Sequence, residues 1–383
     1  VDCADTLRAG TTALKLALNT VKSGSARRVL VTASDCRLGM QRSEYEQTLG
    51  DGAAALEVGD ADVIATVIDS YSVVNEMVDV WREEGNRFVR SWEDRFIVDE
   101  GYQRVMTEAI SSLLKKCNLA AQDITKAVLY AADARKHQGL IRSLKLDPKA
   151  QVQDGLFASV GCTGAAHALL MLAAALEESK AGDKILLASY GDGADVFLLE
   201  VTENIERMKK AKRRGFGGHL GSKTMVKDYS AYAIWRGIIS VEAAARRPEA
   251  AVPSASANWR ERDQNLRYHG AKCNVCGTVQ YPPQRLCTRC HTKDNFQAVR
   301  LSDKRGTVYT YSMDYLTATP DVPLVLTVVN FEGGGRTLCT MTDRDPAEVK
   351  VGMPVEMSFR RLHTVAGIHN YYWRTMPVRD QAI

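Results

Sequence analysis

Two Cys-x-x-Cys pairs in the second half of this 383-residue chain constrain its fold most strongly. The pairs are Cys273-Asn-Val-Cys276 and Cys287-Thr-Arg-Cys290. Structural zinc is held tetrahedrally by four thiolates, and each such turn can supply two of them to one ion. The spacing therefore predicts a zinc ribbon with a structural zinc ion, iron being the other metal that fits. The predicted ligands are Cys273, Cys276, Cys287 and Cys290.

Two disulfide bonds are the alternative for these four cysteines. The five remaining cysteines show no pairing pattern, and they are Cys3, Cys36, Cys117, Cys162 and Cys339. No signal peptide is recognisable, so nothing points to the secreted context in which disulfides persist. We therefore expect reduced cysteines and a cytoplasmic protein.

The bulk composition is that of an ordinary globular protein with room for two domains. Hydrophobic residues make up 45% and charged residues 25% of the chain. The net charge of +4 is too small to require a polyanionic partner. No apolar run reaches the roughly 18 residues that a membrane helix needs, so no membrane partner is expected. The chain begins at Val1, within what reads as a secondary-structure element already under way, and we expect further residues before it.

One pattern of helix, strand and glycine turn into a second strand occurs twice before residue 204. The elements of the two copies are, in chain order, Thr11–Lys22, Arg28–Ser34 and Gly50–Val58, then Thr163–Lys180, Lys184–Tyr190 and Gly191–Val201. The helix of the second copy is apolar on most faces, which predicts its burial. Such a duplication predicts two pseudo-equivalent halves that share a layered α/β core.

The rest of the chain has a different character. A segment with the basic run Lys209–Arg214 and short helical patterns at Tyr229–Arg236 and Ile239–Ala245 reads as a linker. Short alternating strands with glycine turns follow the cysteine pairs and predict an all-β barrel, most simply an OB fold. The predicted parts are an N-terminally incomplete α/β domain over 1–203, a helical linker over 204–265, the zinc ribbon over 266–298 and the OB-fold domain over 299–383.

Several short motifs of the duplicated region belong together. They are Arg8-Ala-Gly-Thr-Thr-Ala-Leu14, Val21-Lys-Ser-Gly24, Gly50-Asp-Gly-Ala-Ala54, Gly161-Cys-Thr-Gly164 and Ser189-Tyr-Gly-Asp-Gly193. This region resembles the thiolase superfamily, in its 3-hydroxy-3-methylglutaryl-CoA synthase-like branch. The resemblance implies an α/β thiolase-like layered core with internal duplication.

A second set of motifs spans residues from about 225 to 378. Besides the ribbon, they are Trp259-Arg-Glu-Arg262, Tyr281-Pro-Pro283, Gly306-Thr-Val-Tyr309 and Val351-Gly-Met-Pro-Val355. This part resembles the zinc-ribbon/OB-fold proteins that accompany thiolases and such synthases. The resemblance implies that the core is followed by a zinc ribbon and an all-β OB-fold barrel.

The first resemblance also implies a site for Claisen chemistry on CoA thioesters. Such chemistry needs a thiolate that holds the acyl group, groups that move protons, and an oxyanion hole. The family's cysteine falls on Leu7, which cannot act as a nucleophile, and Cys3 lies upstream as a displaced candidate. The family's histidine falls on Tyr130, with His137 further on, and its asparagine falls on Cys162.

Cys162, Tyr130 and His137 are the candidate catalytic residues. Cys162 is expected at the start of the long helix, where the helix dipole lowers a thiol pKa, although it can equally be a small residue packed at a tight turn. Tyr130 can donate a proton or hold an oxyanion, but it is no base at neutral pH. His137 can equally be a surface or CoA-side histidine.

Three functions are compatible with these features. The first is acyl-CoA metabolism, with CoA thioesters bound for C–C bond formation or cleavage. The second is a non-catalytic scaffold that channels CoA thioesters to a thiolase partner, with the thiolase-like domain also able to form a homodimer. The third is single-stranded nucleic-acid binding by the ribbon and OB fold, which the interleaved acidic residues of the barrel disfavour.

Overall fold

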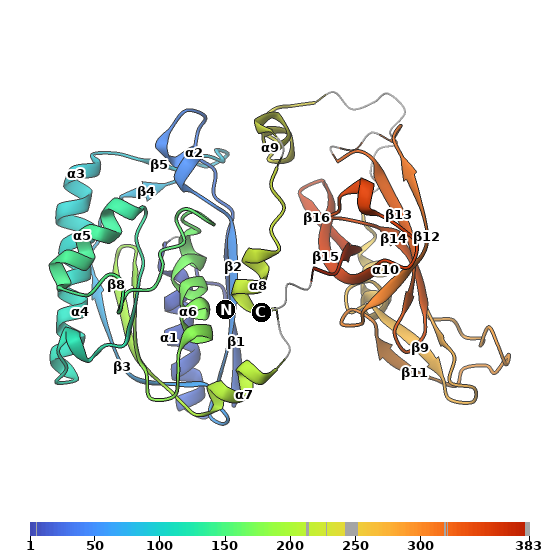
Figure 1. Ribbon diagram of the computed structural model, residues 1–383, viewed down its shortest axis with the longest axis horizontal. Coiled ribbons are helices and arrows are strands. Elements are labelled where there is room, and N and C mark those ends of the chain that lie inside the picture. Colours follow the sequence, from blue (N-terminus) through green and yellow to red (C-terminus); the bar gives the residue numbers. More distant parts are fainter. Residues whose placement is uncertain are drawn as a thin grey trace. The chain divides into compact units, whose positions relative to one another are not determined.

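A computed structural model describes residues 1–4, 6–211, 214–226, 228–241, 252–317, 319 and 321–379. The chain forms two compact units, Val1–Gly221 and Ser222–Ile383 (Figure 1). The basic run Lys209–Arg214 and the predicted helix Ile239–Ala245 each fall partly outside the described residues. Within the described residues, no helix is long and apolar enough to span a membrane.

The first unit is built around a four-stranded sheet in the order β3-β8-β7-β6. The strands are β3 (Ala65–Val74), β6 (Lys126–Leu129), β7 (Lys184–Tyr190) and β8 (Gly193–Val201). β6 and β7 are parallel, whereas the other two pairs are antiparallel. β7 and β8 are buried almost throughout because helices cover both faces of this sheet.

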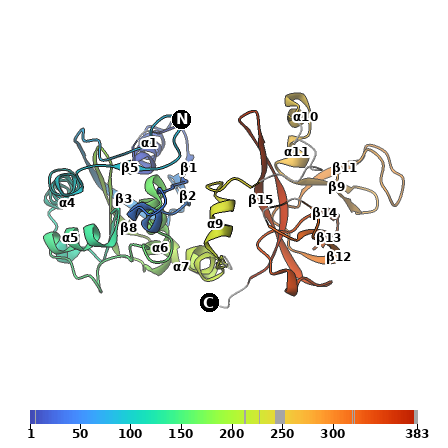
Figure 2. The same cartoon turned by 90° about the horizontal axis from the view of Figure 1, so that it is seen from above.

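The layers of the first unit place two helices between two sheets. α1 (Ala9–Lys22) and α6 (His167–Glu178) lie between the four-stranded sheet and the pair β1 (Arg28–Asp35) and β2 (Gly52–Gly59), and Figure 2 shows this from above. α4 (Arg104–Lys116) packs on the outer face of the larger sheet. The layered α/β core predicted from the sequence is confirmed.

The predicted duplication appears as two equivalent helix–strand–strand units. α1, β1 and β2 correspond to α6, β7 and β8, and in each copy the two strands pair antiparallel. α6 is buried on most faces because it lies between the two sheets, as its apolar composition predicts. The two units therefore pack against each other through α1 and α6 and share one hydrophobic core.

A buried ion pair links the two copies. Arg8 Nη1, just before α1, lies 3.2 Å from Asp195 Oδ1 on β8. The carboxylate also accepts hydrogen bonds from the hydroxyls of Thr11 at 3.1 Å and Ser72 at 2.7 Å. The second guanidinium nitrogen of Arg8 donates to the Asp192 carbonyl in the β7–β8 turn. This network fixes the start of α1 against the central sheet.

The remaining elements of the first unit are short or peripheral. They are α2 (Glu44–Thr48), β4 (Val80–Trp81), β5 (Arg90–Ser91), α3 (Asp94–Phe96), a π-helix (Ile97–Gln103), a 3₁₀ turn (Ala121–Asp123), α5 (Ala134–Leu144), a 3₁₀ turn (Gly164–Ala166), α7 (Asn204–Lys210) and α8 (Gly215–Gly221). α7 and α8, which the sequence places in the linker, belong to the first unit. The Phe216 N–H donates to Glu177 of α6 at 2.5 Å and so ties α8 to the core.

The second unit joins a ribbon to a barrel. Its elements are α9 (Tyr229–Trp235), α10 (Ala255–Arg260), α11 (Arg262–Asn265), β9 (His269–Cys273), β10 (Val279–Gln280), β11 (Phe296–Arg300), β12 (Gly306–Asp314), β13 (Leu324–Phe331), β14 (Arg336–Thr340), a 3₁₀ turn (Pro346–Glu348), β15 (Pro354–Val365) and β16 (Ile368–Pro377). The ribbon sheet has the order β10-β9-β11, and the barrel sheet has the order β14-β13-β12-β15-β16.

The five-stranded sheet curls until its ends meet, which is the closure expected of an OB-type barrel. Met341 forms a bridge with Thr375 of β16, and the Thr342 N–H donates to the Thr375 carbonyl at 2.8 Å. A buried Tyr268 joins ribbon and barrel, because its hydroxyl lies 2.7 Å from Thr337 Oγ1 and its ring packs against Phe331. Ribbon and barrel therefore form one structural body.

Candidate active site and metal centre

The four cysteines of the two Cys-x-x-Cys pairs come together in the structure. Their sulfurs all lie within 4.8 Å of one another, with Cys273 Sγ 3.6 Å from Cys290 Sγ and Cys276 Sγ 3.5 Å from Cys287 Sγ. Zinc–sulfur bonds of about 2.3 Å put the sulfurs of a tetrahedral site about 3.8 Å apart, so the arrangement fits zinc. All nine cysteines are free thiols, which removes the disulfide alternative.

The two metal-binding turns have the same backbone geometry. The Gly277 N–H donates to the Cys273 carbonyl at 2.9 Å, and the His291 N–H donates to the Cys287 carbonyl at 3.0 Å. Gly277 and His291 both have positive φ, 75° and 61°, so the second turn places a histidine where the first has the less strained glycine. The four ligands are thus fixed by backbone pairing.

Two threonines support the sulfurs of these turns. Thr278 Oγ1 lies 3.2 Å from Cys276 Sγ, and Thr292 Oγ1 lies 3.1 Å from Cys290 Sγ. The hydrogen bond between Thr278 and Cys276 lowers the pKa of Cys276 to about 6, and the one between Thr292 and Cys290 lowers the pKa of Cys290. Both effects favour the thiolate that binds metal. All four cysteines are used, which leaves no open coordination position for chemistry and indicates a structural zinc site.

Tyr130 and Cys162, which are distant in the sequence, meet inside the first unit. The Tyr130 hydroxyl lies 3.5 Å from Cys162 Sγ, and each residue is only 1% exposed. Tyr130 directly follows β6, and its carbonyl accepts a hydrogen bond from the Tyr102 hydroxyl at 2.7 Å. Burial raises the pKa of Tyr130 well above its usual value. The hydroxyl therefore stays protonated and can donate a hydrogen bond, but it cannot accept a proton as a base.

Cys162 does not start the long helix as predicted. Its backbone pairs with the segment before β2, because its N–H donates to the Thr48 carbonyl at 2.8 Å and its carbonyl accepts from the Gly50 N–H at 3.1 Å. Gly164 has a φ of +54°, and α6 begins only at His167 after a 3₁₀ turn. Cys162 therefore lies two residues before the 3₁₀ turn that leads into α6, and not in the first turn of α6 itself.

His137 lies on α5 and is buried rather than exposed on the surface. It is 7% exposed, and its ring centre lies 5.5 Å from that of Phe157. Burial lowers the pKa of His137, so the imidazole is neutral at physiological pH. The structure thus places Tyr130 in direct contact with Cys162. His137 is connected to this pair through ring contacts with Phe157 and, beyond it, with a further histidine.

That further histidine, His167, is not among the residues predicted from the sequence. It opens α6 and is fully buried, with its ring centre 5.8 Å from that of Tyr130 and 5.7 Å from that of Phe157. Burial lowers its pKa to about 4, although the backbone of Gly155 favours the charged form. A single histidine in an apolar helix is usually a core residue, so the sequence alone offers no signal for it.

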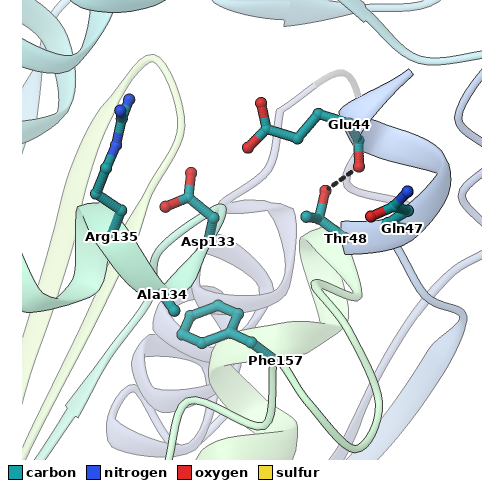
Figure 3. A pocket seen from close by; sticks show the side chains of 7 residues that line it. All are labelled: Glu44, Gln47, Thr48, Asp133, Ala134, Arg135 and Phe157. Carbon is teal, nitrogen blue, oxygen red and sulfur yellow. Dashed lines mark hydrogen bonds between the residues drawn. The ribbon is translucent and has the colours of Figure 1, made fainter. Parts of the chain in front are cut away.

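A pocket of about 330 Å³ opens beside these residues (Figure 3). Its lining comes from α2, the start of α5 and the loop before α6, and consists of Glu44, Gln47, Thr48, Asp133, Ala134, Arg135 and Phe157. Phe157 lines the pocket and also packs against both histidines. Its ring therefore links the lining of the pocket to the buried cluster, which consists of Tyr130, Cys162, His137 and His167.

Leu7 and Cys3, the other two residues considered from the sequence, are not part of this cluster as defined. Leu7 is partly buried and packs against the core of the first unit just before α1. Cys3 is a partly exposed free thiol. The structure also places the buried Arg37 near the cluster.

Three parts of the chain match models of known protein families. Residues 114–198 match the family described as 3-oxoacyl-[acyl-carrier-protein (ACP)] synthase III C terminal. Residues 270–295 match the ChsH2 rubredoxin-like zinc ribbon domain, and residues 298–360 match the ChsH2 C-terminal OB-fold domain. Each match covers the part of the chain in which the corresponding fold is found.

The most similar curated relatives include archaeal synthases. The chain is 31% identical over 206 residues to the hydroxymethylglutaryl-CoA synthase of Methanopyrus kandleri, and this match covers 53% of the chain and 58% of the relative. It is 29% identical to that of Methanosarcina mazei, with 61% of the chain and 67% of the relative covered. The chain thus spans a little under three fifths of the first relative.

The fold is shared with a solved structure described as HMG-CoA synthase complexed with CoA. The TM-score is 0.53 at 19% identity, with 66% of this chain and 67% of that chain covered. The motif resemblances found in the sequence are thereby confirmed at the level of fold and domain type. This chain joins a thiolase-like domain, with hydroxymethylglutaryl-CoA synthases among its relatives, to a zinc ribbon and an OB-fold domain of the ChsH2 type.

Proposed function

We propose that this protein binds CoA thioesters and takes part in forming or cleaving carbon–carbon bonds of acyl-CoA substrates. The observation that carries this proposal is the buried contact between Tyr130 and Cys162, in a cluster that packs against Phe157 of the pocket lining. The curated relatives, named as synthases of hydroxymethylglutaryl-CoA, support the substrate class. The nine free cysteines fit a reducing compartment, and we place the protein in the cytoplasm.

The geometry supports a division of roles between the two residues. The protonated Tyr130 hydroxyl would donate a hydrogen bond to the thioester carbonyl and stabilise negative charge on its oxygen. Cys162 would accept the acyl group. In that exchange a bond forms between Cys162 Sγ and the acyl carbon, the bond to the CoA sulfur breaks, and the thiol proton ends on the released CoA.

A second candidate function is a non-catalytic subunit that holds CoA thioesters for a partner thiolase. It is favoured by Leu7, which stands where the resemblance to the synthases expects the nucleophilic cysteine, and by the burial that keeps Tyr130 protonated. In this case the thiolase-like domain would pair with a thiolase or with a second copy of itself. Acyl-CoA binding is common to both candidates, whereas acyl transfer to Cys162 distinguishes them.

Calorimetry and intact-mass measurement together test these proposals. Titration of the full chain with acetyl-CoA should release or absorb heat with a saturable isotherm. Incubation with acetyl-CoA should add one acetyl group to the wild type but not to Cys162→Ala, with the exposed Cys36→Ala as the matched control that keeps the adduct. Binding without an adduct would favour the non-catalytic subunit. An adduct on Cys3 would contradict the assignment of the acyl group to Cys162. The absence of heat with both acetyl-CoA and acetoacetyl-CoA would contradict CoA-thioester binding itself.

A further inference from the structure

Four arginine side chains of the second unit form ion pairs with only two carboxylates among the described residues. This arginine cluster consists of Arg344, which follows β14, Arg360 of β15, Arg374 of β16 and Arg379, which follows β16. Arg344 pairs with Asp321, and Arg360 pairs with Asp343. Arg379 donates to the backbone carbonyls of Asp343 and Ser222, so its charge has no carboxylate in this part of the molecule.

Strand pairing places Arg360 and Arg374 on the same face of the barrel sheet. In the β15–β16 pair, Arg360 lies opposite Tyr372, and Ser358 lies opposite Arg374. The two arginines are therefore diagonal neighbours on adjacent strands, a spacing across which long side chains can reach each other. Two positive charges thus face each other on this part of the barrel.

Arg374 has neither a hydrogen-bond nor an ion-pair partner in the part of the chain that the structure describes, and its Nε is buried. Burial lowers the pKa of Arg374, the charge of Arg360 lowers it further, Asp321 raises it and Arg344 lowers it again. The side chain stays charged nevertheless, because a guanidinium is not deprotonated in proteins. A partly buried charge is costly unless it is paired, so this position calls for an anion.

The chemistry of the arginine cluster favours a phosphate group as that anion. A guanidinium presents its N–H donors as a planar fork, which matches two oxygens of one phosphate. A phosphate monoester carries close to two negative charges at neutral pH. It would therefore compensate both arginines that lack a carboxylate, Arg374 and Arg379, whereas a single carboxylate would compensate one.

We propose that Arg374, flanked by Arg360 and Arg344, binds a phosphate group on the barrel of the second unit. This inference is independent of the proposed function, because every residue that carries it belongs to the second unit. Free phosphate and the phosphates of CoA present the same chemistry to these arginines. Competition between the two compounds distinguishes the sources.

Titration calorimetry of the full chain with inorganic phosphate, at constant ionic strength, tests this site. We expect saturable binding to the wild type and at least about tenfold weaker binding to Arg374→Gln, the effect of one lost charge-assisted hydrogen bond. Arg374→Lys, which keeps the charge but not the fork, should have an intermediate affinity. Arg361→Gln is the matched control, since it removes an exposed arginine of β15, and it should bind phosphate as the wild type does.

Melting of the second unit without phosphate separates binding from a merely structural role of Arg374. Arg374→Gln removes a charge that faces two others, so its melting temperature should equal or exceed that of the wild type. Added phosphate should raise the melting temperature of the wild type and of Arg361→Gln, but not that of Arg374→Gln. A clearly lower melting temperature of Arg374→Gln without phosphate would show that this arginine is structural, and would overturn the proposal.

The remaining outcomes decide between the site and its alternatives. Equal phosphate affinities of the wild type and Arg374→Gln, or an effect that chloride reproduces at the same ionic strength, would refute the site. Binding of a single-stranded oligonucleotide without binding of phosphate would replace it with a nucleic-acid contact. Displacement of bound phosphate by CoA would support the site with CoA as the source of the phosphate group, and phosphate that stays bound in saturating CoA would support it with free phosphate as the ligand.

Discussion

Removal of zinc should unfold the ribbon and lower the melting temperature of the second unit. Structural zinc sites contribute about 10–16 kcal/mol of binding free energy in isolated zinc-finger peptides at neutral pH, and this energy is coupled to folding. The loss should spread into the barrel, because Tyr281 of the ribbon and Tyr372 of β16 share a hydrogen bond of 2.7 Å between their hydroxyls. Scanning calorimetry of the full chain with and without a chelator measures this effect.

A matched pair of variants checks that the effect comes from the metal site. Cys287→Ser removes a buried ligand, whereas Cys36→Ser changes an exposed cysteine of the first unit. We expect Cys287→Ser to lose bound zinc and to lower the melting temperature of the second unit. Cys36→Ser should behave as the wild type. Zinc-free protein that melts at the same temperature as the zinc-loaded protein would show that the site is dispensable for folding.

Asp195→Ala should destabilise the first unit by about 3–5 kcal/mol, because it leaves the buried guanidinium of Arg8 without its carboxylate. The two side chains are only 3% and 14% exposed, and Thr11 and Ser72 would also lose their acceptor. Urea denaturation followed by circular dichroism gives the free energy of unfolding. The loss should be concentrated in the transition of the first unit.

The matched control for this variant is an ion pair on the surface. Asp62 lies 3.8 Å from Arg207, and both side chains are about 70% exposed. Arg207→Ala, which breaks the same pair at a helical position, should change the free energy of unfolding by no more than about 0.5 kcal/mol, since exposed pairs contribute little. Equal effects of the two substitutions would mean that the buried Arg8–Asp195 pair contributes no more to the free energy of unfolding than an exposed ion pair does.

The features predicted correctly from the sequence are those with a short-range signal. The zinc ligands lie in two local turns, so their spacing alone specifies the chelate. The burial of α6 follows from a composition that is apolar on most faces, and the duplication follows from repeated strand and turn motifs. Each of these signals resides within a few consecutive residues, where backbone geometry dictates how side chains are placed.

The buried cluster depends instead on contacts between distant segments. The resemblance to synthases indicated Tyr130 and Cys162 separately, but spacing could not show that they lie 3.5 Å apart. His137 was a candidate catalytic residue that could instead be a surface or CoA-side histidine, because the sequence does not reveal that the ring of Phe157 packs on it. His167 was missed for a related reason, since its significance comes from the Thr163 N–H and from the rings of other elements.

We propose that the first unit receives a CoA thioester at the buried cluster beside Phe157. Hydrogen–deuterium exchange of the full chain with and without acetyl-CoA tests it most directly. We expect slower exchange in the loop over residues 154–162 and at the start of α6, where the ligand would order the backbone. Saturating acetyl-CoA that leaves this loop unchanged, or that protects only the ribbon and barrel, would contradict it.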